Sequence, residues 1–502
     1  MRGASALVNT TPSSPASGGI PDRFPKGNDW FYRLARTFLN QTIRLYYRRI
    51  EVAGRDHIPS SGPAILVANH PNSSADAFLL ASQLTPRKLN FIAKDSLTRA
   101  PVLGWIFRQF GLVGVARAVD YERQRDLARR RNQSAIATCV PRLLAGELLT
   151  IFGEGISTDA RRLHMIRKGA MRFGYSAEQT ADFQLGLVWI PVGISYSAKQ
   201  HFRSDVFIRV GEPFRLTDLD PDPAATGRKL LQRGTERLQR DLESLVLNIE
   251  REELAGLIDQ AAELFGNPAS SLAARVERHQ RISRAVHYFN LAEPSRLAEL
   301  EGALHRYRQK LADQGLTDEV VRMRHPTLTL WVNLLGVLMN GSLMLLNLYG
   351  WANSLIPRWC AALYRPFGRR PLTWWWTTAR RDEERETQKE ALYGTYGGWA
   401  GAAMAFPLQI YWVSHWMSLR YGAETGIIAG ALYGFSLIPS WRLFLRRRDF
   451  FRQHYATMRD AIRFLVNAAP ATKLQRHRRQ IQRRLRALLA AYEAGAPRPT
   501  GP

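Results

Sequence analysis

Cysteine is nearly absent from this chain. Its 502 residues include two cysteines, Cys139 and Cys360, both in apolar surroundings. Two distant cysteines support neither a disulfide framework nor a metal site, and they fit a reducing compartment. The first 27 residues are rich in Ser, Gly and Pro and lack the apolar run of a secretion signal. We therefore predict a disordered tail over 1–27 that is not a secretion signal.

Acidic residues are scarce relative to basic ones. The chain has 70 Lys and Arg against 43 Asp and Glu, which gives a net charge of +27. An excess of this size predicts a polyanionic partner, either nucleic acid or an anionic membrane surface. The 13 Trp and 17 Tyr, several of which flank uncharged runs, favour anionic membrane lipids. We therefore expect no nucleic acid partner, and salt-sensitive DNA binding would contradict that expectation.

Short apolar runs alternate with helical patterns between residues 50 and 215, which predicts an α/β domain with a largely buried sheet. The longest helical pattern among them is 121–144, and a basic, aromatic helical pattern over 28–49 precedes them. That first helix could lie in a lipid interface or cover its own domain. The expected strands are 50–52, 64–68, 89–93, 112–116, 148–152, 187–192 and 206–210.

The second half of the chain has two different characters. Residues 225–326 predict a wholly helical domain for packing or dimerisation, whereas 327–445 contain long uncharged runs. The runs 391–419 and 425–441, joined by a turn, predict a transmembrane hairpin. The run 327–356, divided at Asn340-Gly341 into limbs too short to cross, predicts a re-entrant or monotopic hairpin.

Arginines on either side of these runs predict the orientation. The segments 357–390 and 446–502 are both rich in Arg, and the positive-inside rule places them in the cytoplasm. We therefore interpret 446–502 as a basic cytoplasmic helical tail. The α/β domain is expected on the cytoplasmic face of the cell membrane.

A candidate general base follows the second expected strand. The apolar run 64–68 delivers Asn69 and His70 to its end, and Pro71 prevents an ordinary helical continuation. A helix is expected to start near Ser74 and to carry Asp76 in its first turn. A histidine with a nearby carboxylate can deprotonate a hydroxyl while the carboxylate holds the ring in one tautomer. The alternative is a histidine that only caps local structure.

Four sequence blocks carry a family resemblance. NHPNSSAD (69–76), AKDSLTRAPVLGWIFRQFGLVGVAR (93–117), FGEGIS (152–157) and IPVG (190–193) resemble the glycerolipid acyltransferases in order and spacing. The longer His–Asp spacing, GEGIS-x-D, and RKGA (167–170) resemble the bacterial and fungal glycerol-3-phosphate acyltransferases, which append helices and a membrane segment. The resemblance covers 45–215 well and 225–445 loosely. It implies an α/β acyltransferase domain over 28–224, with a mixed sheet flanked by helices, followed by the helical domain and the membrane-embedded helical region.

The resemblance also implies roles for individual residues. His70 would take the proton of the acceptor hydroxyl and Asp76 would hold the imidazole. No Ser or Cys nucleophile elbow is visible, so we expect direct transfer without an acyl-enzyme. The implied substrate-binding residues are Asn69, Arg117, Glu154, Gly155, Ser157 and Lys168.

Each of the stronger substrate assignments has a structural alternative. Arg117 would clamp a phosphate or form a surface ion pair. Glu154 and Gly155 would contact the glycerol backbone of the acceptor or only form a turn. Lys168 would contact phosphate at the start of the helix predicted over 168–177, or carry a solvated charge.

One position departs from the family pattern. The family usually has proline where this chain has Gly153. Replacing proline by glycine loosens the unfolded chain at a cost of about 1 kcal/mol, and it softens the expected acceptor loop. The departure weakens the assignment of the acceptor more than that of acyl transfer.

The sequence therefore predicts a membrane-bound O-acyltransferase of phospholipid biosynthesis, without metal or organic cofactor. It would move a fatty acyl group from acyl-CoA or acyl-carrier protein to the sn-1 hydroxyl of glycerol 3-phosphate, a phosphorylated glycerol acceptor. One alternative is acylation of 1-acylglycerol 3-phosphate or another lysolipid. A second alternative is a non-catalytic membrane protein that binds lipid.

Overall fold

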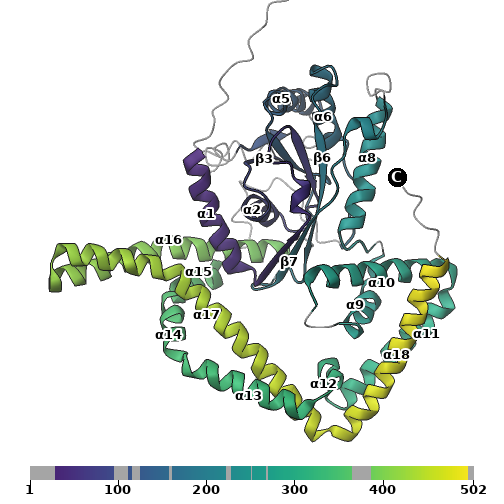
Figure 1. The fold of residues 1–502 in the computed structure, drawn as a ribbon, viewed down its shortest axis with the longest axis vertical. Helices are drawn as coiled ribbons and strands as arrows, with labels where there is room; N and C mark the ends of the chain where they lie inside the picture. The colour runs from purple at the N-terminus through teal and green to yellow at the C-terminus, as the bar shows by residue number, and fades with distance from the viewer. Residues whose placement is uncertain are drawn as a thin grey trace, which may run out of the picture.

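The computed structural model describes most of the chain, in two connected parts. A sheet domain lies above a broad arc of helices, and a helical hairpin projects sideways from the arc (Figure 1). The predicted tail over 1–27 lies outside the described residues. The described residues are 29–94, 111–115, 125–157, 161–199, 201–221, 228–249, 251–266, 270–364 and 386–495.

The sheet has seven strands within the described residues, in the order β1-β7-β6-β2-β5-β3-β4. Neighbouring strands are parallel except β6 and β7, which pair antiparallel, so the sheet is mixed. The predicted strands are all present, and the main difference is that β6 runs four residues past its predicted end. The strands are β1 (Arg49–Ala53), β2 (Ala64–Ala68), β3 (Leu89–Lys94), β4 (Val113–Val115), β5 (Leu148–Phe152), β6 (Val188–Tyr196) and β7 (Asp205–Val210).

Strand β2 is buried on both faces because alternate side chains enter two separate cores. Ile65 and Val67 pack with α5 (Arg125–Leu144), α6 (Gly169–Thr180) and α8 (Arg228–Leu245). Leu66 packs with α1 (Asp29–Tyr46) and α2 (Ser74–Gln83) on the other face. The predicted fold class, an α/β domain with a mixed sheet flanked by helices and followed by helical regions, is confirmed.

The sequence left open whether helix α1 lies in a lipid interface or covers its own domain. Its Leu39 and Ile43 are buried against the sheet domain, whereas Leu34 and Phe38 are exposed. The helix therefore covers its own domain and still presents an apolar edge to the outside.

The helical domain differs from its predicted boundaries at both ends. Helix α8, which we assigned to the domain 225–326, packs on the sheet through Leu230, Leu238 and Leu242. Helix α18, which we interpreted as a separate tail, shares one core with the helical domain and joins it through Arg478, whose guanidinium contacts Asp318 at 2.8 Å. The elements of this domain are α9 (Ala255–Leu264), α10 (Leu272–Ala292), α11 (Pro294–Asp313), α12 (Asp318–Arg322) and α18 (Ala468–Gly495).

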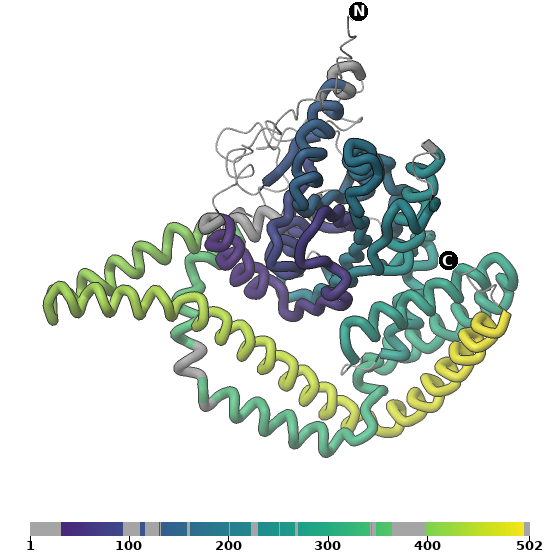
Figure 2. The backbone as a smooth tube through the Cα atoms, turned by 45° about the horizontal axis from the view of Figure 1, so that its top comes forward, coloured from purple at the N-terminus to yellow at the C-terminus, as the bar shows by residue number. Residues whose placement is uncertain are grey.

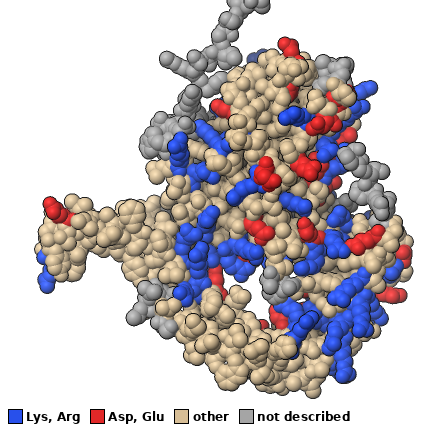
Figure 3. All heavy atoms as spheres, viewed as in Figure 1, with Lys and Arg blue, Asp and Glu red and all other residues tan. Residues whose placement is uncertain are grey.

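The uncharged runs form the projecting hairpin and the part of the arc that the helical domain does not form. The hairpin consists of α16 (Glu386–Tyr421) and the first half of α17 (Ala423–Val466), with the turn at Gly422, as predicted. A side chain at Gly426 or Gly430 would collide with Ser414, so these glycines allow the close helix contact that the sequence suggested. Figure 3 shows that the hairpin surface is nearly free of charge except at its tip. Among the described helices, α17 is long and apolar enough to cross a membrane.

The hairpin predicted over 327–356 is not present, because the run does not fold back on itself. It forms α13 (Pro326–Ser342), α14 (Met344–Asn353) and the start of α15 (Leu355–Tyr364), with a break beside the expected Asn340-Gly341. Asn340 donates to the carbonyl of Arg447, and Asn353 accepts from Tyr433. The segment therefore continues in one direction, antiparallel to α17, and Figure 2 shows the two as the long arms of the arc.

Helix α17 is also tied to the sheet domain. The guanidinium of Arg203 contacts the carboxylate of Asp449 on α17 at 2.7 Å and donates to the carbonyls of Leu45 and Tyr47. Arg442 of α17 donates to Gln41 of α1. These contacts join the arc to the sheet domain beside the strand ends.

Candidate active site

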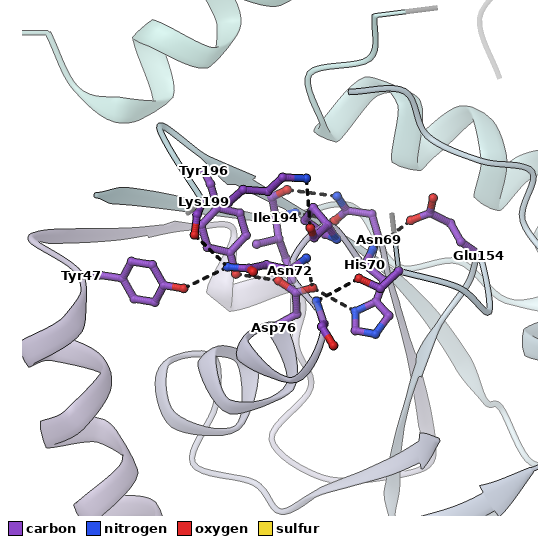
Figure 4. A network of polar contacts seen from close by, with 12 residues as sticks. Tyr47, Asn69, His70, Asn72, Asp76, Glu154, Ile194, Tyr196 and Lys199 are labelled. Carbon is purple, nitrogen blue, oxygen red and sulfur yellow. Dashed lines mark hydrogen bonds and ion pairs between the residues drawn. The ribbon is translucent and has the colours of Figure 1, made fainter. Parts of the chain in front are cut away.

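His70 and Asp76 lie together at the carboxyl edge of the sheet. Strand β2 ends at Ala68, a turn follows, and α2 begins at Ser74 with Asp76 in its first turn. The Nδ1 atom of His70 lies 2.9 Å from Oδ2 of Asp76. Figure 4 draws this contact as a dashed line. The predicted pair is therefore in contact, and the local strand–turn–helix is what joins its members.

Asp76 is a buried carboxylate whose oxygens have three donors. Its side chain has no exposed surface. It accepts hydrogen bonds from His70 Nδ1–H, from the amide of Asn72 at 2.7 Å and from the hydroxyl of Tyr196 at 2.6 Å. Because an ionised carboxylate only accepts, this arrangement assigns the proton to Nδ1 and leaves a lone pair on Nε2 of His70.

Tyr196 is a site residue that the sequence analysis missed. Burial, and then the charge of Asp76 and the neighbouring Tyr47, raise the pKa of Tyr196 well above its ordinary value, so its hydroxyl stays a donor. Tyr47 is buried beside it, and burial likewise raises the pKa of Tyr47. Tyr196 lies 120 residues from Asp76, at the end of β6 that the predicted strand did not reach.

The His70 ring is held on a second side by Phe152. The two rings stack with centroids 3.8 Å apart and an angle of 12° between their planes. Phe152 is the last residue of β5, which pairs with β2, so the sheet register sets this contact. The imidazole is 18% exposed and lines a cleft.

Glu154 positions the backbone of His70. Its Oε1 accepts from the amide of His70 and its Oε2 accepts from the amide of His164, both at 2.9 Å. The carboxylate is buried and also lines the cleft. Glu154 therefore holds the loops on either side, and its predicted contact with the acceptor stays a prediction.

Asn69 uses both polar side-chain atoms within the fold. Its Oδ1 accepts from the amide of Ile194 at 2.7 Å and its Nδ2 donates to the carbonyl of Ile194 at 3.0 Å. The side chain therefore links β2 to β6, and the predicted substrate contact of Asn69, which lines the cleft, stays a prediction. Ser157 similarly accepts from the amide of Ser73, where the backbone has a positive φ of 49°.

The two glycines that follow β5 are each required for a different structural reason. Gly155 has a φ of 69°, a conformation that favours glycine. The amide of Gly153 donates to the carbonyl of Ala68 at 2.9 Å, and an added Cβ would lie 2.9 Å from Ile166. Proline, the residue that the family pattern has there, would lose this hydrogen bond and crowd this neighbour.

Of the two predicted phosphate contacts, the structure describes one. Arg117 lies outside the described residues. Lys168 precedes α6, is exposed, and is not among the described residues that line the cleft. A phosphate role for either residue stays a prediction.

The cleft beside His70 has a volume of about 1610 Å³. It runs from the strand ends of the sheet domain to the helices of the arc, so its walls come from both parts of the molecule. Within the described ranges, no group of three or more His, Cys, Asp or Glu side chains is placed to hold a metal ion.

Known proteins are similar to parts of this chain. Residues 49–195 match the family model described as Acyltransferase. The chain is 29% identical over 254 residues to the lyso-ornithine lipid O-acyltransferase of Brucella abortus (strain 2308), which covers 44% of this chain and 86% of that protein. A solved structure, the 1-acyl-sn-glycerophosphate (LPA) acyltransferase PlsC from Thermotoga maritima, is similar with 19% identity and a TM-score of 0.32, over 43% of this chain and 82% of that one. The segment 49–195, which contains His70, Asp76 and Glu154, is thus similar to the Acyltransferase family.

Proposed function

We propose that this protein is a membrane-associated O-acyltransferase that moves a fatty acyl group from a thioester donor to the free hydroxyl of a lysolipid. The contact between His70 and Asp76, at the edge of a cleft in a domain of the Acyltransferase family, carries this proposal. Sequence reasoning favoured glycerol 3-phosphate as acceptor. The relative named for a lyso-ornithine lipid supports the lysolipid alternative instead.

The proposed chemistry follows from the tautomer of His70. Its Nε2 accepts the proton of the acceptor hydroxyl as the oxygen attacks the thioester carbonyl. Asp76 stabilises the imidazolium that forms, and Tyr196 and the Asn72 amide keep the carboxylate in place. The carbon–sulfur bond then breaks, an ester bond remains on the acceptor, and the imidazolium returns its proton to the thiolate that leaves.

A lipid acceptor fits the surface of the helical arc. Four large aromatic residues have more than half of their surface exposed: Trp331 of α13, Trp412 and Trp416 of α16, and Phe435 of α17. Aromatic and aliphatic side chains exposed in this way are typical of membrane contact. We therefore place the protein at the cell membrane, with the sheet domain on the cytoplasmic face where the arginines following the uncharged runs lie.

The test is acyl transfer by the full-length protein in lipid nanodiscs. Lyso-ornithine lipid, 1-acylglycerol 3-phosphate and glycerol 3-phosphate are offered with acyl-CoA and with acyl-carrier protein. We expect a lysolipid to be acylated and His70→Ala to lower the rate at least ~100-fold. His305→Ala, an exposed histidine of α11, is the matched control and is expected to act as the wild type.

Two outcomes would contradict the proposal. Preferential acylation of glycerol 3-phosphate would show that this compound, which the sequence favoured, is the acceptor. Lipid binding without acyl transfer to any of these acceptors would instead favour the non-catalytic alternative.

A further inference from the structure

The wall of the cleft that faces the sheet is built by residues outside the family domain. Helix α10 contributes Arg275 and Arg278, α12 contributes Arg322, and α17 contributes Arg452. His70 lines the same cleft from the sheet domain. One hollow therefore connects the candidate base to a set of guanidinium groups supplied by the helical regions.

The cleft is strongly cationic, and Figure 3 shows Lys and Arg side chains gathered around this hollow. Several of its arginines are already paired: Arg275 contacts Asp205, Arg161 contacts Asp259 and Arg203 contacts Asp449. In the described part of the chain, no carboxylate lies within ion-pair distance of Arg162, Arg278 or Arg452. Arg162 comes from the segment before α6, Arg278 from α10 and Arg452 from α17, and together they form a site for a ligand with several negative charges.

We propose that Arg278 and Arg452 bind the phosphate groups of a coenzyme A thioester, so that the helical regions form the donor site of the enzyme. The inference rests on the proposed function, because that function requires a thioester beside His70. Coenzyme A carries its phosphates at one end and its thiol at the other, with the flexible pantetheine arm between them. A hollow with the base at one wall and arginines at the other matches this distribution of groups.

Two other anionic ligands fit less well. In 1-acylglycerol 3-phosphate the phosphate is attached to the carbon beside the hydroxyl carbon, so it must lie close to His70 and not on the opposite wall. An acyl-carrier protein is a folded body that cannot enter a cleft of about 1610 Å³, and its prosthetic arm brings a single phosphodiester. The concave shape and the number of arginines therefore favour the small polyanion.

Binding of coenzyme A itself tests the inference without requiring turnover. The full-length protein in nanodiscs is titrated by calorimetry with coenzyme A and with pantetheine, which has the same arm and no phosphate. We expect Arg278→Gln combined with Arg452→Gln to weaken coenzyme A binding at least about tenfold, because each lost guanidinium removes charge-assisted hydrogen bonds. Pantetheine binding is expected to stay unchanged.

The matched control removes the same charge from the same two helices. Arg281→Gln on α10 with Arg463→Gln on α17 changes exposed residues that do not line the cleft. This variant is expected to bind coenzyme A as the wild type does. In turnover with acyl-CoA, the cleft variant is expected to show a raised KM with nearly unchanged kcat.

The outcomes separate this inference from the proposed function. Equal binding of coenzyme A by wild type and cleft variant, or equal binding of coenzyme A and pantetheine, would overturn the inference. Acyl transfer from acyl-carrier protein alone would also overturn it while leaving the proposed function intact. Arginine-dependent binding of coenzyme A by a protein that acylates none of the acceptors would support the donor site and refute the proposed function.

Discussion

The sheet domain and the helical arc place apolar side chains in opposite ways. Leu66 of β2 is fully buried between the sheet and its covering helices, whereas Leu335 of α13 keeps 58% of its surface exposed. Burial from water is the main stabilising contribution in the first case. In the second case the exposed side chains are suited to a lipid phase. The comparison teaches that the sheet domain buries its apolar side chains, whereas α13 presents them to the outside, and that the cleft at the junction of the two parts is lined by many arginines.

The largest expected effect concerns the polar centre of the sheet domain. Asp76→Asn keeps the size of the side chain but removes the charge that holds Nδ1–H of His70. We expect kcat for acyl transfer to fall by ~10²–10⁴-fold, because the imidazolium loses its stabilising partner. Asp313→Asn, at the exposed end of α11, is the control. Near-normal kcat in Asp76→Asn would remove the carboxylate from the mechanism.

Two identical leucine truncations test the comparison of the two regions directly. Leu66→Ala is expected to lower the free energy of unfolding by about 2–5 kcal/mol, since it leaves a cavity in a packed core. Leu335→Ala is expected to change it by less than about 0.5 kcal/mol in detergent. Urea unfolding followed by circular dichroism measures both. Equal losses would mean that the arc has a core of its own at this position.

A charge introduced into the arc tests its affinity for lipid. Phe435→Arg changes an exposed side chain in the apolar half of α17 and is expected to disfavour membrane insertion by about 2.5–3.5 kcal/mol. Phe451→Arg makes the same change in the basic half of the helix and is expected to have little effect. The fraction that resists alkaline extraction from membranes measures insertion. Equal extraction of both variants would argue against a membrane segment here.

The smallest expected effect is on the support of Asp76. Tyr196→Phe removes one donor from the carboxylate, and kcat is expected to fall about tenfold with KM nearly unchanged. Because the pKa of Tyr196 is raised in the folded state, an unfolded tyrosine releases its proton first as pH rises above about 10. The wild type should therefore lose stability relative to Tyr196→Phe above that pH. Parallel stability profiles from pH 8 to 11 would show that folding does not raise the pKa of this hydroxyl.

Local sequence patterns were sufficient to predict the strands, the helices and the contact between His70 and Asp76. The apolar run before His70 predicts β2, and five residues lie between the histidine and Asp76, so one turn of chain determines their contact. The same reasoning placed the turn at Gly422 between α16 and α17.

Contacts between distant segments could not be predicted in the same way. Tyr196 contacts Asp76 from another strand, and no local sequence pattern predicts this contact. Asn69 and Glu154 resemble substrate ligands in sequence, but backbone amides and a carbonyl elsewhere in the fold occupy their polar atoms. Helix α18 has the composition of a solvated tail, and only the presence of α9 to α12 beside it explains the burial of Leu485.

The contact between Arg203 and Asp449 has a consequence for where the reaction can take place. Helix α17 continues without a break from its apolar half through Asp449, and a helix advances about 1.5 Å for each residue. The number of helical residues between Phe435 and Asp449 therefore fixes the distance between these two residues along the helix axis. With α17 inserted in the membrane as we propose, this number sets the height of the imidazole above the hydrocarbon, and an acceptor must present its hydroxyl at that height.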